Sequence, residues 1–149
     1  MSTEKNKAIV RRWFEEVLND RRLDRADDHV AQDYVDHGAL PGQAPGLGGA
    51  KRKWATYAAA FPDLRTWSED MVAERDEVAV RWMAEGTQQG ELLGIPPSGK
   101  QARFTGMSIF RLAEGKIAEQ WEEWDKLDLM RQLSVMPSPG HRSSQSGRP

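Results

Sequence analysis

The sequence predicts an α+β domain in which N-terminal helices cover one face of a strongly bent antiparallel sheet. Two observations carry this prediction: helical periodicity dominates residues 4–61, and long hairpin-linked strands dominate residues 64–125. A third is length, because 149 residues suffice for one domain with a core and a pocket. A bent sheet closed by helices encloses a cone, which is a natural place for a ligand.

The N-terminal half contains the predicted helices. Apolar residues recur at helical spacing after Ser2 and Thr3, either of which can supply the N-cap oxygen. Glycines and prolines then mark a loop, and Pro62 ends the last helix because proline restricts the residue before it. The expected elements are a helix at 4–19, a short helix at 23–30, an extended segment at 33–37, a loop at 38–49 and a helix at 50–61.

The C-terminal half contains the predicted sheet. Turn signals stand at Arg75-Asp76 and at Ala113-Glu114-Gly115, where Gly115 is available for a positive φ. We expect one domain over residues 1–136 and a disordered tail over residues 137–149, which are rich in Ser, Pro, Gly and Arg. The expected elements are strands at 64–74, 77–89, 101–112 and 116–125 and a closing helix at 127–133.

Composition argues against several classes of protein. The net charge of -2, from 21 basic and 23 acidic residues, gives no broad positive field for nucleic acid, and the Lys51-Arg52-Lys53 run is interpreted as a solvated turn. There is no cysteine, so no disulfide, thiol nucleophile or cysteine-based zinc site is expected. His29, His37 and His141 lack metal-ligand spacing. No apolar run is long enough to cross a membrane, and we expect a cytoplasmic protein.

The strand predicted at 116–125 holds two tryptophans among four carboxylates. Alternation along an extended strand puts Ile117, Glu119, Trp121, Glu123 and Asp125 on one side and Ala118, Gln120, Glu122 and Trp124 on the other. An acid beside an indole in a closed space has a raised pKa and can act as a base. The alternative is a solvated edge strand whose tryptophans are amphipathic lids.

Several motifs together resemble the SnoaL-like polyketide cyclase, or ester cyclase, family over residues 6–135. They are Tyr34-Val35-Asp36-His37, Gly86-Thr87-Gln88-Gln89-Gly90-Glu91, Gly94-Ile95-Pro96-Pro97-Ser98-Gly99-Lys100 and the ending Gly115-Lys116-Ile117…Trp121…Trp124-Asp125…Gln132-Leu133. The resemblance implies the nuclear-transport-factor-2-like fold, a cone-shaped α+β barrel. A shared fold hosts many reactions, so the resemblance alone does not select one of them.

The resemblance also implies a mechanism. In the characterised cyclases an aspartate on the last long strand removes a proton from a carbon between two carbonyls of a polyketide ester, and the enolate then attacks a carbonyl of the same molecule. Asp125 is the best match to that aspartate, with Trp121 to desolvate it and Glu123 able to share its proton. Because the substrate delocalises the carbanion, neither a cofactor nor a metal is expected.

Histidines of the family are missing here. Many relatives carry a histidine where Gln88 stands, and the cyclases use one on the penultimate long strand, whereas residues 101–112 contain none. A glutamine can orient a carbonyl but cannot exchange a proton at neutral pH. His37 is the candidate substitute, although a histidine that bonds loop backbone would look the same in sequence.

The remaining candidates are expected to bind substrate. Arg81 can hold a carboxylate or enolate, or simply pair with a strand acid. Aromatic and apolar candidates for the pocket wall can equally be core. The full predicted set is Asp125 and His37 as catalytic residues, with Tyr34, Trp54, Tyr57, Arg81, Trp82, Gln88, Phe104, Met107, Trp121 and Glu123 as substrate-binding residues.

The leading hypothesis is therefore a cofactor-independent cyclase of secondary metabolism, of the kind found in antibiotic biosynthesis. It would close a ring in a small apolar or aromatic polyketide-like substrate by an aldol-type step. Rivals are an accessory hydroxylase or epoxide-opening enzyme of the same fold, a non-catalytic binding protein for an apolar metabolite, and a structural dimer module. The tryptophan content favours a homo-oligomer, either a dimer or a tetramer.

Overall fold

The computed structural model describes residues 2–133, so the predicted tail at 137–149 lies outside the described residues. Helices come first, the four long strands follow, and a short helix comes after the last strand, as predicted. The elements are α1 (Thr3–Arg12), the π-helix η1 (Trp13–Asn19), the 3-10 helix η2 (Leu23–Arg25), α2 (Ala26–His29), β1 (Val30–Asp36), α3 (Gly46–Ala60), β2 (Arg65–Glu74), β3 (Glu77–Thr87), β4 (Gln101–Ala113), β5 (Lys116–Trp124) and α4 (Lys126–Gln132).

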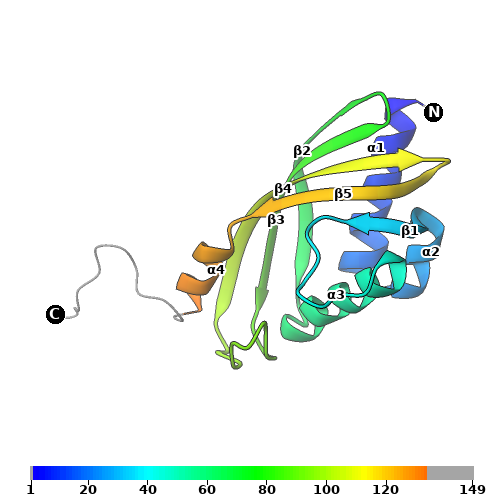
Figure 1. The fold of residues 1–149 in the computed structure, drawn as a ribbon. Coiled ribbons are helices and arrows are strands. Elements are labelled where there is room, and N and C mark those ends of the chain that lie inside the picture. The colour runs from blue at the N-terminus through cyan, green and yellow to red at the C-terminus, as the bar shows by residue number, and fades with distance from the viewer. Residues whose placement is uncertain (1, 134–149) are drawn as a thin grey trace.

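One curved sheet of five strands forms the body of the molecule, in the order β1-β5-β4-β3-β2 (Figure 1). β2 to β5 are antiparallel neighbours, while β1 joins the edge as a strand parallel to β5. Figure 1 shows α1, α2 and α3 on one side of the sheet and α4 beyond the far end of β5. The predicted α+β fold with a bent sheet covered by helices is confirmed, with a parallel edge strand added.

The first predicted helix is continuous but changes its winding. Ser2 caps it, since its side chain accepts a hydrogen bond from the backbone N of Lys5. From Trp13 onward the hydrogen bonds reach five residues back, as from Asp20 N to Glu15 O at 2.8 Å. Asn19 then ties this end to β2, because its side chain accepts from Thr66 N and donates to Thr66 O. The junction fixes the helix against the sheet.

The helix α3 begins four residues earlier than the sequence predicted. Glycine-rich residues 46–49 were expected in the loop, but they form its first turn, with Pro45 at the N-cap. The reason is close packing: a Cβ on Gly49 would stand 1.7 Å from the carbonyl oxygen of Ala44. Glycine here allows the loop to fold back tightly onto the helix start.

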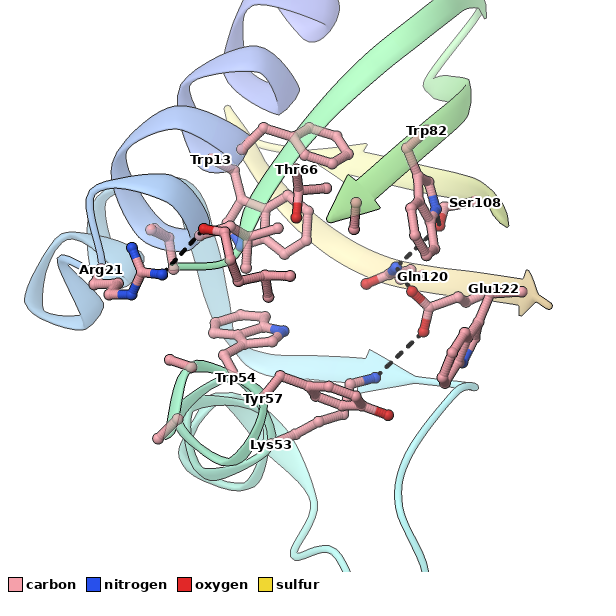
Figure 2. Close-up of a pocket in the computed structure, with 18 of the residues that line it drawn as sticks. Trp13, Arg21, Lys53, Trp54, Tyr57, Thr66, Trp82, Ser108, Gln120 and Glu122 are labelled. Atoms are coloured by element: carbon pink, nitrogen blue, oxygen red, sulfur yellow. Dashed lines mark hydrogen bonds and ion pairs between the residues drawn. The ribbon is translucent and has the colours of Figure 1, made fainter. Parts of the chain in front are cut away.

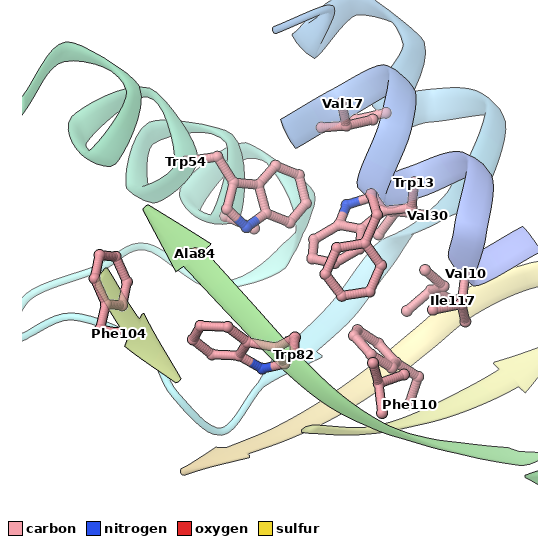
Figure 3. Packing of buried hydrophobic residues seen from close by; sticks show 14 of the residues in the cluster. Val10, Trp13, Val17, Val30, Trp54, Trp82, Ala84, Phe104, Phe110 and Ile117 are labelled. Carbon is pink, nitrogen blue, oxygen red and sulfur yellow. The ribbon is translucent and has the colours of Figure 1, made fainter. Parts of the chain in front are cut away.

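The β4–β5 hairpin has the predicted turn chemistry. Glu114 and Gly115 have φ values of 51° and 79°, the signs that a type I′ turn requires. Above the sheet, the core is aromatic: Trp13 meets Trp54 and Phe110 edge to face, each at 5.4 Å between ring centroids (Figure 3). Aromatic side chains thus pack the helices against the sheet, and a cavity remains beside these side chains.

Candidate functional site

A cavity of about 250 Å³ lies between the helices and the inner face of the sheet (Figure 2). Its volume is just below the usual range of small-molecule sites, which starts at about 300 Å³, and its wall is largely aromatic, as such sites usually are. Polar side chains are few and come from distant elements. The aromatic lining residues are Trp13 and Phe14 of η1, Trp54 and Tyr57 of α3, Trp82 of β3, Phe104 and Phe110 of β4, and Trp124 of β5.

Glu122 is the carboxylate that faces this cavity. It stands on β5 directly opposite Ser108 of β4, which also lines the cavity. Space for its side chain is left by Gly38, where a Cβ would come within 2.8 Å of Glu122 Oε1. The Glu122 side chain is 17% exposed, so its charge is largely removed from water.

Lys53 connects Glu122 to a second buried acid. Its ammonium lies 2.9 Å from Asp36 Oδ2, 3.0 Å from the carbonyl of Gly38 and 3.5 Å from Glu122 Oε1. The side chains of Lys53 and Asp36 are only 7% and 4% exposed. The sequence-based interpretation of residues 51–53 as a solvated turn is therefore wrong for Lys53, because α3 turns that side chain inward to the two acids.

A hydrogen-bond chain runs along the floor of the cavity beside Glu122. The hydroxyl of Tyr34 donates to Gln120 Oε1, and Gln120 Nε2 donates to Ser108 Oγ at 3.3 Å and to Glu122 Oε2 at 3.5 Å. Trp82 Nε1 also donates to Ser108 Oγ, at 3.0 Å. Ser108 thus accepts two hydrogen bonds, and its own hydroxyl hydrogen has no acceptor among residues 2–133.

Burial raises the pKa of Glu122, since the carboxylate has lost water and its two bonds to protein donors are long. The negative charge of Asp36 raises it further, while Lys53 acts in the opposite direction. Burial and the same two acids raise the pKa of Tyr57 to about 12. At neutral pH the Tyr57 phenol therefore keeps its proton and remains a donor at the cavity wall.

Four of the predicted substrate-binding residues line the cavity: Trp54, Tyr57, Trp82 and Phe104. Tyr34 lies behind the wall, 2% exposed, and supports Gln120. These five are brought together by the bend of the sheet and by α3 packing over it. Their part in binding a substrate stays a prediction.

Asp125 is placed elsewhere. It follows the last residue of β5, is exposed, and accepts from Asp128 N at 3.0 Å as the N-cap of α4. Glu123 and Trp121 likewise point to the outer side of the strand. The expected inward position of these three residues is not found, because Ala118 is inserted as a bulge between Ile117 and Glu119 in the pairing with β4. The bulge exchanges the faces, so that Gln120, Glu122 and Trp124 point inward.

His37 also lies outside the cavity. Its ring stacks on Trp121 at 5.0 Å between centroids, and Nε2 is 2.6 Å from Glu119 Oε2. Arg111 donates to the same Glu119 carboxylate. This cluster sits on the outer side of the sheet, so the position of His37 gives no support to its predicted role as the acid partner in the pocket.

The last three predicted residues have local partners. Gln88 is fully buried under the loop after β3, where its side chain donates to the carbonyls of Gly90 and Ile95 and accepts from Ser98 N. Arg81 is exposed and pairs with Asp70, which was the alternative weighed for it. Met107 is 60% exposed on the outer face. None of the three lines the cavity.

Sequence reasoning did not select several of the polar residues at the cavity. Glu122, Gln120 and Trp124 were recognised as one face of the strand, but nothing in the pattern marked that face as the inner one. Lys53 could have been found from its place four residues before Tyr57, on the same face of the same helix. Ser108 and Thr66 carry no sequence signal, since lone hydroxyl residues are common on any strand.

No three His, Asp or Glu side chains of residues 2–133 converge in a way that would hold a metal ion. No helix in the same range is long and apolar enough to span a bilayer.

The sequence profile of the SnoaL-like polyketide cyclases matches residues 8–133, and the chain belongs to this family. None of the curated proteins gives a significant match. TsrD from Streptomyces laurentii is 26% identical with a TM-score of 0.84, over 91% of this chain and 99% of TsrD. IdmH, a proposed polyketide cyclase from Streptomyces antibioticus, is 30% identical with a TM-score of 0.75, over 87% and 99% of the two chains.

AclR, a proposed hydroxylase from Streptomyces galilaeus, is also similar: 25% identity and a TM-score of 0.78, over 91% of this chain and 100% of AclR. The fold is thus the nuclear-transport-factor-2-like fold of this family, and the family and its neighbours support a polyketide cyclase-like function. One neighbour with a different proposed activity shows that the fold alone does not select the reaction.

Proposed function

We propose that this protein catalyses a cyclase-type ring closure, without a cofactor, and that Glu122 rather than Asp125 is its general base. The observation that carries the proposal is the placement of Glu122. It is a carboxylate with a raised pKa at the wall of an aromatic cavity, and it lies opposite Ser108, whose hydroxyl hydrogen has no acceptor among residues 2–133. Its bonds to Lys53 and Gln120 are both 3.5 Å, so it is free to turn toward a ligand.

In the proposed reaction one proton passes from the substrate to Glu122 and later returns to the product. Glu122 takes a proton from a carbon between two carbonyls, and the enolate oxygen receives hydrogen bonds from the hydroxyls of Ser108 and Tyr57. The enolate carbon then attacks a second carbonyl of the same molecule, forming a carbon–carbon bond and an alkoxide. Protonated Glu122 returns its proton to that alkoxide, so the step changes no oxidation state. The aromatic wall holds the chain folded and excludes water.

The test compares Glu122→Gln with Asp125→Asn on a methyl ester of an aromatic poly-β-ketone that carries a free carboxylate at its other end. Both substitutions keep the shape, and asparagine retains the helix-capping ability of Asp125. We expect Glu122→Gln to lower kcat by about a hundredfold to ten-thousandfold, the usual contribution of a general base. Asp125→Asn should retain most of the activity. The opposite pattern would return the base to Asp125, and an active Glu122→Gln would end the proposal.

Hydroxylation is the second candidate, and one observation favours it. No histidine lines the cavity in residues 2–133, so the acid partner implied by the family is not there as an imidazole. The two functions give different products from the same substrate: ring closure adds no atoms, whereas hydroxylation adds one oxygen atom from dioxygen and needs two electrons from an external reductant. Mass spectrometry of the product separates them, and binding without any product would leave the non-catalytic binding protein.

A further inference from the structure

Arg21 places a positive charge at the edge of the cavity. It follows η1 with a left-handed backbone, at a φ of 57°. Its guanidinium donates to three neutral backbone carbonyls, those of Asn19 at 2.9 Å, Leu64 at 3.0 Å and Phe61 at 3.4 Å. These contacts occupy three of the five N–H donors and leave two. The side chain is thereby held in position without an ion pair. Asp63 is near enough for the Arg21 charge to lower its pKa, but its carboxylate oxygens accept hydrogen bonds from Thr87.

The two neighbouring arginines behave differently. Arg22 pairs with Asp24, and Arg25 pairs with both Glu16 and Asp28. No carboxylate of residues 2–133 forms an ion pair with Arg21. Within one short segment, the arginine at the cavity is the one bound by carbonyls alone, and a carbonyl can anchor a guanidinium without cancelling its charge.

The opposite end of the cavity is acidic. There Lys53 is shared between Asp36 and Glu122, which leaves one uncompensated negative charge whenever Glu122 is ionised. Figure 2 shows Arg21 and Glu122 on opposite sides of the cavity, with Trp54 and Tyr57 between them. An anionic group on a ligand is repelled at the Glu122 end and attracted at the Arg21 end, so this arrangement selects both a charge and an orientation.

The cavity wall contains a further donor without a partner. Trp13 lines the cavity and is 4% exposed, and its Nε1 has no hydrogen-bond partner among residues 2–133. A buried donor left unpaired is costly, and a ligand oxygen or a water between the ligand and the indole would remove that cost. Trp13 Nε1 is thus a second donor in the cavity wall that a ligand oxygen can use.

We propose that the ligand of this cavity is an aromatic or polyketide-like molecule with a carboxylate at one end, which Arg21 binds at the mouth. The opposite, uncharged end would reach Glu122 and Ser108. Arg21 is then a specificity-determining residue that selects acids over neutral esters or amides of the same shape. The orientation rests on the proposed function of Glu122, but the preference for an anion does not.

The test uses two probes of nearly equal shape, 2-naphthoate and 2-naphthamide, titrated calorimetrically into the purified full-length protein. We expect the wild type to bind 2-naphthoate about tenfold more tightly than 2-naphthamide, as for a charge-assisted contact. Arg21→Gln keeps a donor for the Leu64 carbonyl but removes the charge, and should abolish this preference. Arg21→Lys should retain most of it, and Arg22→Gln, at the adjacent exposed pair, should retain all of it.

Added salt gives a test that needs no variant. The affinity for 2-naphthoate should fall as ionic strength rises, while that for 2-naphthamide should stay constant. Equal binding of the two probes to the wild type, no binding of 2-naphthoate, or an unchanged preference in Arg21→Gln would each overturn the proposal. Since Glu122→Gln is expected to bind 2-naphthoate without loss even when turnover is lost, failure of the base assignment and failure of the anion site give different results.

Discussion

At the scale of single residues, the site contains a buried carboxylate, Glu122, whose ionised form is unfavourable for folding. Burial raises the pKa of Glu122, so the folded protein binds this proton more tightly than the unfolded chain does. The stability that the protonated form contributes is lost as pH rises through the folded-state pKa. Near neutral pH, ionised Glu122 is therefore a cost to folding that its chemistry requires.

A stability prediction follows for Glu122→Gln, which keeps the shape and cannot ionise. We expect this variant to unfold at a higher temperature than the wild type at pH 8, by the equivalent of about 1 kcal/mol. The gain should shrink as pH falls and Glu122 becomes protonated in both states of the wild type. Calorimetric scans across pH measure this; a variant that is less stable at pH 8 would mean that Glu122 is a net stabilising partner of Lys53.

Lys53 is expected to control both stability and the pH profile. Replacing it by methionine leaves Asp36 and Glu122 buried without a cation, a change that costs about 3–5 kcal/mol for buried pairs. Because Lys53 lowers the pKa of Glu122, its removal should also move the acid limb of kcat/KM to higher pH.

The matched control for that prediction is Lys51→Met, on the same helix. Lys51 pairs with Asp27 at the surface, and its loss should change urea unfolding far less and leave the pH profile in place. If the two lysine variants were equally stable, Lys53 would contribute no more than a surface pair.

At the scale of elements, the start of α3 offers a test with two adjacent glycines. Gly48 has no atom within 4 Å of where a Cβ would stand, whereas a Cβ at Gly49 would meet Ala44 O. Alanine favours helices over glycine, so Gly48→Ala should stabilise the protein by roughly 0.5–1 kcal/mol. Gly49→Ala should destabilise it, and urea unfolding of both variants checks the opposite signs. Similar behaviour of the two would mean that the fold of loop and helix is looser than described.

The loop after β3 depends on one buried amide. Gln88→Leu keeps much of the side-chain volume but leaves Ser98 N and the carbonyls of Gly90 and Ile95 without their hydrogen-bond partner. Each unpaired group costs about 1–3 kcal/mol of stability if no water replaces the amide. We expect faster hydrogen exchange over residues 89–100, with exchange in β4 and β5 nearly unchanged. Uniform acceleration across the sheet would instead identify Gln88 as part of the global core.

The order and type of the elements were predictable, because helical and alternating periodicities are local properties of the chain. The inner face of β5 was not. Strict alternation from Ile117, which is buried, would place Asp125 inward; the bulge at Ala118 reverses that assignment, and a bulge depends on the register with β4. Trp54 and Trp82 could be proposed as pocket residues because the hydrophobic pattern is local. Glu122 and Lys53 could not, because their inward position depends on how the elements pack.

At the scale of the whole molecule, the outer face of the sheet carries a row of apolar side chains in register across four strands. Val72, Ala79, Ile109 and Trp121 are successive neighbours in this row, and three of them are among the exposed large hydrophobic residues. Exposed apolar patches often mark contact surfaces. The homo-oligomer stays a prediction, and this row is the surface on which we expect two copies to meet.

Light scattering of the full-length protein checks that expectation. The wild type should have the mass of a dimer, and Ile109→Lys should shift it toward the monomer by placing a charge in the row. Thr105→Lys, exposed on the same strand but away from the row, should leave the mass unchanged. A monomeric wild type at high concentration would show that self-association is not a property of this chain.

The distribution of indoles has a practical consequence. Of the six tryptophans, Trp13, Trp54, Trp82 and Trp124 line the cavity, so most of the intrinsic ultraviolet emission of the protein originates within reach of a bound molecule. Occupancy should displace water from these rings and quench or blue-shift their fluorescence. Intrinsic tryptophan fluorescence can therefore report ligand binding, and libraries of unlabelled compounds can be screened in this way without knowledge of the reaction.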